Sequence, residues 1–448
     1  MNRRTFIKTT GLGAASFLLP TSLISAAEQN TDILNQADVR IEKYRMTNAT
    51  LNVLGPNGKP LAGRTPVSIK QIRHKFLFGC NIFKLNSCRT PDDNSAYAEQ
   101  FGALLNFATL PFYWWNYEGQ RGKPQDARTE EIVNWCKEQN ITTKGHPLAW
   151  NYAQPRWLPK DTKTAMQLQM NRIERCTRLF KDKVDIWDVV NEATHYDRDT
   201  CKKRAPTLTE AISKMGVKAY ICEAFKRARN GNHSATLIIN DYRTDQSFAE
   251  KVISKLLDDN GQPLYDVIGI QSHMHSGYWG PKKAWETCER FAKFGKPLHY
   301  TETTLVSGLQ GWELRTKRKD PNFRWLSTPK GEQRQAKQVA EFYRVLFSHP
   351  AVEAITWWDF TDQNSWQQAP AGLLRDDMTP KPAYNELKKL IKGKWWTQIE
   401  TTTKTAGEIK FRGFYGQYEV SAHIGGQKIT GRFNLDKKTT KTINIRLS

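Results

Sequence analysis

The stretch Val184-Asp-Ile-Trp-Asp-Val-Val-Asn-Glu192 is the part of the sequence from which the fold is most readily predicted. Its apolar and β-branched residues up to Val190 are typical of a buried strand, which then breaks into the polar pair Asn191 and Glu192. In a barrel of parallel strands, side chains at the C-terminal strand ends point into the mouth, where active sites lie. The alternative is that Asn191 and Glu192 cap the next helix. From this stretch alone both interpretations stand, because Asn and Glu are ordinary helix-start residues.

A second stretch, Pro297-Leu-His-Tyr-Thr-Glu-Thr-Thr304, repeats this pattern. It predicts a short strand that delivers Glu302 to a strand end. Cleavage of a glycosidic bond by a paired acid and nucleophile requires two carboxyl groups at one site. Glu192 and Glu302 are therefore the candidate pair.

Strand-like and helix-like segments alternate from Lys75 to Phe360, as expected for parallel strands joined by helices. The pattern predicts an α/β fold, a (β/α)8 TIM barrel, over residues 71–394. The candidate strands are 75–83, 104–112, 142–150, 184–192, 235–242, 267–274, 297–304 and 352–360. Apolar residues at helical spacing mark helices at 128–139, 163–181, 208–229, 246–258, 332–348 and 379–391.

Small β elements are expected on both sides of the barrel. In residues 28–70, polar and apolar residues alternate from Val39 onward, which predicts strands near 49–54 and 66–72. Residues 395–448 contain further alternating runs joined by Gly-rich turns and predict a small C-terminal β domain. So few residues cannot easily bury a core alone, so we expect this domain to pack with the N-terminal strands. A carbohydrate-binding module is the alternative.

Residues 1–27 are typical of an export signal. Arg3-Arg4, Phe6 and Lys8 precede an apolar run, and Ser25-Ala26-Ala27 suggests cleavage after Ala27. The paired arginines resemble a twin-arginine signal, with an ordinary secretory signal as the alternative. No later apolar run approaches the roughly 20 residues that span a bilayer. We therefore expect export to the periplasm or the extracellular space and no membrane span.

The chain is strongly basic, with a formal net charge of +22. Removal of residues 1–27, which hold three basic residues and no acid, leaves +19. Such a charge favours a polyanionic partner, such as an acidic polysaccharide. The alternative is a solvated basic surface, because Lys and Arg are scattered along the chain. No nucleic-acid recognition motif is present, so no nucleic-acid partner is expected.

The seven cysteines lack zinc spacing, so no metal or other cofactor is expected. Cys80 and Cys88 could pair if the protein matures in an oxidising compartment, and the sequence leaves this open.

Five segments together resemble the family 10 glycoside hydrolases of clan A, the endo-β-1,4-xylanase family. They occur in the order of that family and cover roughly residues 70 to 392. The segments are Gly145-His-Pro-Leu-Ala-Trp150, Trp187-Asp-Val-Val-Asn-Glu192, Ile268-Gly-Ile-Gln-Ser-His273, Tyr300-Thr-Glu302 and Thr356-Trp-Trp-Asp-Phe-Thr-Asp-Gln-Asn-Ser-Trp366. The resemblance implies a barrel with a retaining pair of carboxylates.

The resemblance also implies a role for each residue. Glu192 would be the general acid/base and Glu302 the nucleophile of a double displacement. Asn191 would bind the sugar 2-hydroxyl, and His273 would help to hold Glu302 ionised. Gln271, two residues before His273, is expected to reach the mouth as well. The other implied substrate-binding residues are His146, Trp150, Trp358 and Trp366, with core packing as the alternative for each Trp.

The segment after the second strand departs from the family pattern. Pro111, Phe112 and Trp115 replace three polar residues that contact the distal sugar in xylanases. Tyr113 and Glu118 lie in the same segment, and Glu118 is the candidate substitute carboxylate. A lost set of hydrogen-bond donors predicts a changed substrate on the non-reducing side.

Two residues of the other family segments also differ. Asn151 replaces a His, and Thr304 replaces an Asp two residues after the nucleophile. The second replacement alters the network that tunes Glu302.

The leading hypothesis is an exported retaining hydrolase of a β-linked polysaccharide or oligosaccharide, of the endo-β-1,4-xylanase type. One alternative keeps the carboxylate pair but acts on a different β-glycoside, with an acidic one among the options. Another is a catalytically silent carbohydrate-binding protein, against which the presence of both carboxylates argues. The oligomeric state is left open, with a monomer as the default.

Overall fold

The computed structural model describes residues 26–438 and 442–448. The predicted export signal, residues 1–27, lies outside this part except for its last two residues. Among the helices of the described part, none combines the length and hydrophobicity needed to cross a bilayer.

Eight parallel strands close into a barrel in the order β10-β3-β4-β5-β6-β7-β8-β9. Each predicted strand segment overlaps one of them, so the predicted TIM barrel is confirmed. Most of their apolar side chains are buried, as in strands with both faces covered. The strands are β3 (Leu77–Asn81), β4 (Phe107–Pro111), β5 (Thr142–His146), β6 (Ile186–Asn191), β7 (Thr236–Asp241), β8 (Val267–Met274), β9 (Leu298–Leu305) and β10 (Val352–Trp357).

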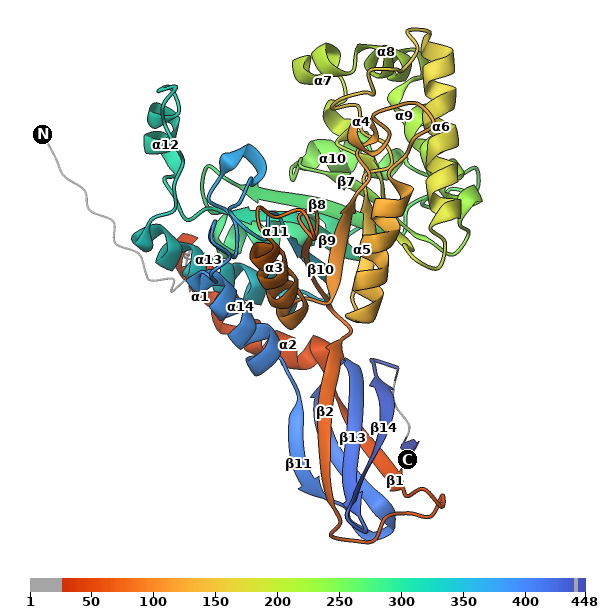
Figure 1. The fold of residues 1–448 in the computed structure, drawn as a ribbon, viewed down its shortest axis with the longest axis vertical. Coiled ribbons are helices and arrows are strands. Elements are labelled where there is room, and N and C mark those ends of the chain that lie inside the picture. The colour runs from red at the N-terminus through yellow and green to blue at the C-terminus, as the bar shows by residue number, and fades with distance from the viewer. Residues whose placement is uncertain (1–25, 439–441) are drawn as a thin grey trace, which may run out of the picture.

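Helices surround the barrel, and several stand above its mouth (Figure 1). The predicted helix 208–229 is two helices, because Gly216 between them has a positive φ of 84° that ends the first. The helices are α3 (Pro91–Leu104), α4 (Trp114–Tyr117), α5 (Asp126–Glu138), α6 (Thr162–Leu179), α7 (Asp199–Arg204), α8 (Pro206–Met215), α9 (Val217–Gly231), α10 (Gln246–Lys251), α11 (Gly280–Ala292), α12 (Gly311–Lys317), α13 (Pro329–Ser348) and α14 (Pro382–Lys389).

The N-terminal β element begins later than predicted. Two helices, α1 (Ala26–Asn35) and α2 (Ala37–Arg45), occupy the residues before position 46. Ala37 and Ile41, four residues apart, are buried, whereas Val39 is 70% exposed. The apolar residues that suggested alternation therefore follow a helical period. The Arg45 guanidinium donates to the carbonyl oxygens of Phe347 and Val352, which fixes the end of α2 to the barrel.

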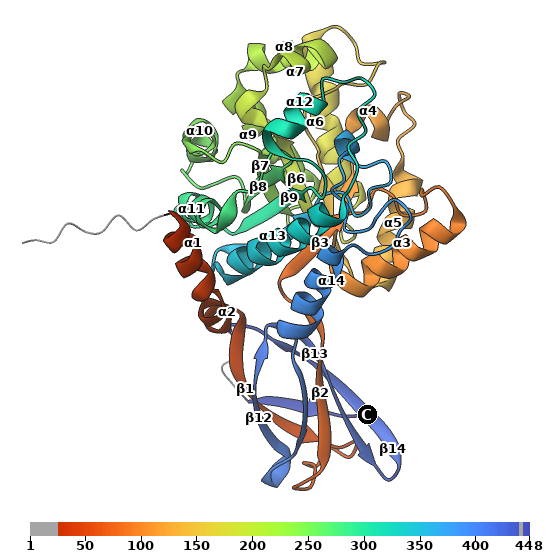
Figure 2. The ribbon, with the colours of Figure 1, turned by 90° about the vertical axis from the view of Figure 1, so that its left-hand side faces the viewer.

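The segments before and after the barrel form one two-sheet module rather than two elements (Figure 2). One sheet has the order β12-β1-β15 and the other β11-β2-β13-β14. The expected packing of the C-terminal strands with the N-terminal ones is thereby confirmed. The strands are β1 (Met46–Leu54), β2 (Pro66–His74), β11 (Gln398–Thr402), β12 (Glu408–Phe414), β13 (Gly416–Ile424), β14 (Gln427–Leu435) and β15 (Ile443–Arg446).

The module lies at the end of the barrel opposite the mouth. β2 ends at His74 and leads directly into the start of β3 at Leu77, so it joins the N-terminal strand ends. Between the sheets, apolar side chains such as Leu51, Ile69 and Val420 form a core separate from that of the barrel. The module therefore contributes no side chain to the mouth.

The cysteine pair that the sequence left open is not formed. All seven cysteines are free thiols, and Cys80 is buried in the barrel while Cys88 is partly buried in the following loop. The Cys88 thiol donates to the carbonyl oxygen of Lys84 at 3.4 Å.

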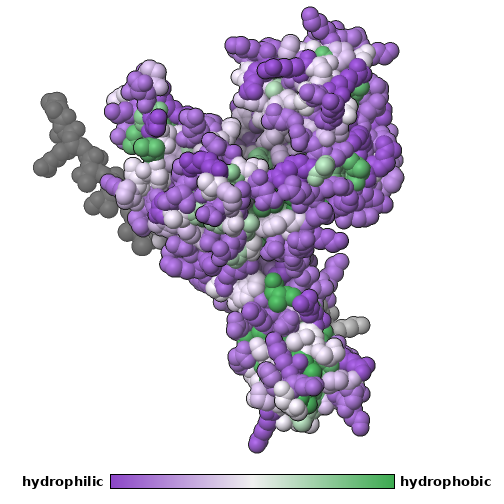
Figure 3. Space-filling view, viewed as in Figure 1, coloured by the Kyte–Doolittle hydropathy of each residue, from purple (hydrophilic) through white to green (hydrophobic). Residues whose placement is uncertain are grey.

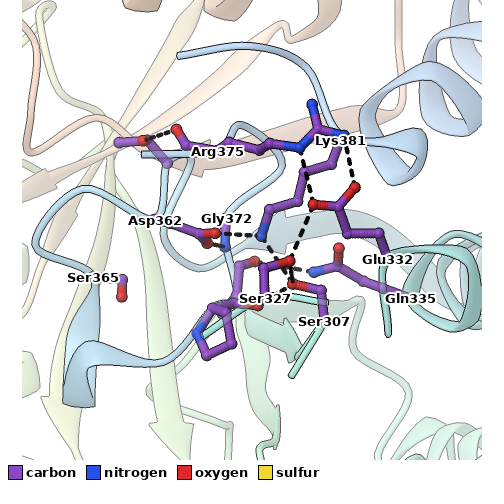
Figure 4. Close-up of polar contacts among 12 residues, drawn as sticks. Ser307, Ser327, Glu332, Gln335, Asp362, Ser365, Gly372, Arg375 and Lys381 are labelled. Carbon is purple, nitrogen blue, oxygen red and sulfur yellow. Dashed lines mark hydrogen bonds and ion pairs between the residues drawn. The ribbon is translucent and has the colours of Figure 1, made fainter. Parts of the chain in front are cut away.

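A buried ionic network fixes the loop after β10, which carries Trp358 and Trp366 (Figure 4). Lys381 is fully buried, and its Nζ lies 2.6 Å from Asp362 Oδ2 and donates to Ser307 Oγ at 3.0 Å. Asp362 also accepts the backbone N–H of Gly372 at 2.7 Å. This network ties the loop to the end of β9 and to the start of α14.

Replacing Lys381 by Met is expected to lower the free energy of unfolding by about 3 to 5 kcal/mol, because Asp362 is left buried without a counter-charge. Urea unfolding measures this loss. Lys389→Met is the control, since Lys389 pairs with Glu386 on the surface and such pairs contribute about 1 kcal/mol or less. Equal losses in both variants would contradict a structural role for the network.

Candidate active site

The two candidate carboxylates lie directly after β6 and in the C-terminal half of β9. Glu192 follows β6 in a left-handed conformation with φ 57°, and its backbone N–H donates to the carbonyl oxygen of Asn240 at 2.9 Å. Such a backbone is strained for a residue other than Gly or Asn, and strain of this kind is common at active sites. Glu302 lies within β9 and is buried.

The neighbouring strand is shaped by Gly145, which directly precedes His146. A Cβ atom at Gly145 would overlap the ring of Trp187 on β6. The glycine therefore allows β5 to pack against this buried Trp, and the next residue, His146, ends the strand at the mouth.

Three side-chain amides and the two carboxylates form one hydrogen-bond network. Gln271 Nε2 donates to Glu192 Oε1 at 3.2 Å and to Asn191 Oδ1 at 3.0 Å. Asn240 Nδ2 donates to the same Asn191 oxygen at 2.8 Å and to Glu302 Oε1 at 2.8 Å. The network holds both carboxyl groups at one cavity of about 450 Å³ that both of them line.

The surroundings of Glu302 favour its ionised form. Burial alone would raise the pKa of Glu302, but the charge of His146 and a hydrogen bond from His273 lower it below its usual value. His273 Nε2 lies 3.1 Å from Glu302 Oε2, and His146 Nε2 lies 3.9 Å from Glu302 Oε1. His273 Nδ1 bonds the hydroxyl of Thr304 at 2.9 Å, so a neutral hydroxyl stands where the family has a carboxylate.

A buried pair that we did not single out in the sequence orients His146. Asp188 Oδ2 accepts from Lys144 Nζ at 2.6 Å and bonds His146 Nδ1 at 2.7 Å. Burial raises the pKa of Asp188, but the charge of Lys144 and the bond to His146 lower it overall. With Nδ1 held in this way, the Nε2 atom of His146 faces Glu302.

The surroundings of Glu192 favour its protonated form. Burial raises the pKa of Glu192, the ion pair with Arg198 lowers it, and the nearby charge of Glu302 raises it, so that the pKa is raised overall. Trp150 Nε1 also donates to Glu192 Oε2 at 3.2 Å. No sequence pattern pointed to Arg198, which lies between the short helical turn after β6 and α7.

Replacing Arg198 by Gln is expected to move the alkaline limb of the pH profile of kcat/KM to higher pH. The Arg198 charge lowers the pKa of Glu192, so its loss raises that pKa and keeps the acid protonated further into the alkaline range. The profile is measured with a soluble aryl glycoside. Arg198→Lys keeps the charge and should move the limb less. An unchanged limb in Arg198→Gln would contradict the coupling.

Aromatic rings form the walls of the cavity. Trp150 and Tyr152 stack with centroids 4.6 Å apart and planes at 16°. Trp358 is buried, whereas Trp366 is 43% exposed at the rim. Of the predicted site residues, the cavity is lined by Tyr113, His146, Trp150, Glu192, His273, Glu302, Trp358 and Trp366.

The predicted role of Glu118 is wrong. Glu118 lines neither this cavity nor the adjoining one, and its carboxylate accepts from Trp114 Nε1 at 3.1 Å and from the backbone N–H of Gly122 at 2.8 Å. The short helix α4 turns this carboxylate away from the mouth. Two of the residues that differ from the family pattern in this segment are also placed by the structure. Phe112 packs in the core against Trp187, and Trp115 lines the cavity.

A second, larger cavity of about 830 Å³ continues the cleft. Trp150, Tyr152, Glu192, His273 and Trp366 border both cavities. The surface is notched between the protruding α12 and the lobe formed by α7 and α8 (Figure 3). In the described part of the chain, no group of three or more His, Cys, Asp or Glu side chains is placed to hold a metal ion.

Two carboxyl groups at the mouth of one parallel barrel, one in surroundings that raise its pKa and one in surroundings that lower it, are typical of the glycoside hydrolases that work with paired carboxylates. The sequence pattern of glycosyl hydrolase family 10 matches residues 70–390. The chain belongs to this family, and the resemblance seen in the sequence is confirmed.

Three comparisons illustrate the relationship. The chain is 25% identical to an anti-sigma-I factor of Acetivibrio thermocellus, covering 90% of this chain and 48% of that protein. It is also 25% identical to endo-1,4-beta-xylanase 1 of Arabidopsis thaliana, covering 90% of this chain and 39% of the relative. It thus spans less than half of either relative. The solved xylanase 10B of Thermotoga petrophila RKU-1, in complex with xylobiose, is 25% identical with a TM-score of 0.57, covering 71% and 95% of the two chains.

Proposed function

We propose that this protein is an exported retaining glycoside hydrolase that cleaves a β-1,4-linked polysaccharide of the xylan type. One observation carries the proposal: two carboxyl groups share one hydrogen-bond network, but their surroundings shift their pKa values in opposite directions. The pKa of Glu192 is raised and that of Glu302 is lowered. Relatives named as xylanases support the substrate, and the signal-like residues 1–27 support export.

In the first step, Glu192 gives its proton to the glycosidic oxygen while Glu302 attacks the anomeric carbon. The bond from that carbon to the leaving sugar breaks, and a covalent ester with Glu302 forms. Asn191 Nδ2 is buried and has no partner within the described protein, so it can donate to the 2-hydroxyl of the sugar being cleaved. His146 and His273 keep Glu302 ionised for the attack.

In the second step, Glu192, now a carboxylate, removes a proton from water. The water attacks the anomeric carbon from the side that the leaving sugar has vacated, and Glu302 is released. Two inversions give net retention. The aromatic walls formed by Trp150, Trp358 and Trp366 offer flat faces against which sugar rings can pack.

The second candidate is a carbohydrate-binding protein without turnover. It is favoured by one observation, that a relative matching 90% of this chain is named an anti-sigma-I factor rather than an enzyme. The intact carboxylate pair argues against it.

Product analysis by proton NMR on xylan, arabinoxylan, glucuronoxylan and other β-glycans separates the candidates. We expect the β-anomer to appear first from a xylan substrate. Early α-anomer would contradict a retaining mechanism. Binding without cleavage of any glycan or aryl β-glycoside would favour the second candidate.

A further inference from the structure

The two halves of the cleft can be assigned from the carboxylates that border them. Glu302 attacks the anomeric carbon, so the sugar being cleaved occupies the cavity of about 450 Å³ that Glu302 lines. Glu192 protonates the oxygen of the leaving sugar. The leaving sugar therefore extends into the cavity of about 830 Å³, which Glu192 lines and Glu302 does not.

This leaving-group cavity has an excess of positive charge. Its basic side chains are Arg198, Lys283 and Arg318, and its one carboxylate is Glu192. Arg198 forms an ion pair with Glu192. Lys283 and Arg318 have no ion-pair partner in residues 26–438 and 442–448. Two formal positive charges thus remain uncompensated in the cavity, which favours an anion there.

Aromatic rings support the two unpaired cations. Lys283 Nζ lies 4.6 Å from the centre of the Trp279 ring, and the Arg318 guanidinium lies 4.3 Å from the Trp325 ring. Arg318 Nη2 donates to Gln367 Oε1 at 3.5 Å, and a guanidinium that stacks on a ring keeps its other N–H groups at the edge, where they can donate to an anion. These contacts hold the charges at the cavity instead of leaving them freely mobile in solvent.

The reaction itself releases the third cation. When Glu192 is protonated and ready to act as the acid, it carries no charge, so Arg198 loses its anionic partner. The Arg198 side chain is 25% exposed and lies between the rings of Tyr152 and Tyr242, at 5.8 and 5.7 Å. An anionic group of the leaving sugar can then take the place of the carboxylate.

We propose that the leaving-group cavity recognises a sugar that carries an anionic substituent, a carboxylate or a sulfate, through Lys283, Arg318 and Arg198. The inference rests on the proposed hydrolase function and adds a preferred substrate class to it. The inference rests on these three side chains, which are the Lys and Arg residues that line the cavity, and not on the net charge of the whole chain.

The first test compares substrates that differ only in the anion. Glucuronoxylan is compared with the same polymer after carboxyl reduction, and a sulfated xylan with its desulfated form. We expect kcat/KM to be about tenfold or more higher for at least one anionic polymer than for its neutral form, because a charge-assisted hydrogen bond contributes at least about 1.5 kcal/mol. The pair that shows the preference identifies the anion. Equal values within both pairs would overturn the proposal.

The second test removes the two unpaired cations in Lys283→Gln/Arg318→Gln. The ratio of kcat/KM for the anionic over the neutral polymer is expected to fall about tenfold. Lys282→Gln/Lys317→Gln is the matched control, because it removes the same charge from adjacent positions that line neither cavity. If the control lowers the ratio as much as the cavity variant does, the overall charge and not the cavity sets the preference.

A binding arm separates failure of the inference from failure of the proposed function. Affinity electrophoresis of Glu302→Gln in gels that contain each polymer reports recognition without digestion. Retardation by the anionic polymer, lost when Lys283 and Arg318 are also replaced, supports the inference even if the unmutated protein cleaves nothing. Cleavage of both polymers without preference, together with equal retardation, leaves the hydrolase function intact and overturns the inference.

Discussion

Replacing Glu302 by Gln is expected to lower kcat on xylan and on aryl β-glycosides by more than about 10⁴-fold, as for removal of other catalytic nucleophiles. The amide has almost the same shape and can still accept the hydrogen bond from Asn240 that Glu302 accepts at 2.8 Å. It cannot form the ester with the anomeric carbon. Steady-state rates measure the loss, and the Tm verifies that the variant is folded.

The Glu118→Gln variant is the matched control for this loss. Glu118 lies in the segment where the sequence predicted a substitute carboxylate, but it lines neither cavity. We expect its kcat/KM to stay within about twofold of the unmutated protein, as for a change that touches no substrate. If Glu302→Gln kept substantial activity, a different group would have to be the nucleophile.

Most of the barrel could be predicted because the majority of its strands are short, largely apolar and buried, although β5 and β9 carry mostly polar side chains. Such strands appear as continuous apolar runs, and the helices between them have a different period. The helices before position 46 could not be separated from strands in the same way. In α2 only Ala37 and Ile41 are buried, and so few apolar residues fit both a period of two and a helical period.

The meeting of the two candidate carboxyl groups could also be predicted, because the barrel fixes the direction of the strands that carry Glu192 and Glu302, and both side chains line one cavity. Asn191 and His273 followed from the family resemblance, and Gln271 followed from its place two residues before His273. Each of these residues contacts a carboxylate or a neighbour of one in the structure.

Residues on loops could not be predicted in this way. Arg198 reaches Glu192 from a loop whose path depends on tertiary packing, and its sequence surroundings are only polar. The prediction for Glu118 was wrong for the same reason, since the single turn of α4 before it sets the direction of its carboxylate. Lys144 and Asp188 lie on strands, and their pairing could have been predicted from the sequence, because a charged residue in a buried barrel strand requires a partner.

The second large effect is expected for Glu192→Ala, and its size should depend on the leaving group. On xylan, whose leaving sugar must be protonated, we expect kcat/KM to fall about 10² to 10⁴-fold, the usual contribution of general acid catalysis. A dinitrophenyl β-glycoside has a leaving group that departs without a proton. The rate of the first step on this substrate should therefore fall much less than kcat/KM on xylan.

The same variant should also slow the second step, because Glu192 is the proposed base that activates water. The ester with Glu302 then accumulates, and a rapid burst of dinitrophenolate precedes a slow steady state. Stopped-flow absorbance measures the burst. Equal losses on both substrates without a burst would show that Glu192 is not the acid/base. In that case the raised pKa of Glu192 would reflect only its burial beside Glu302 and its distance from solvent.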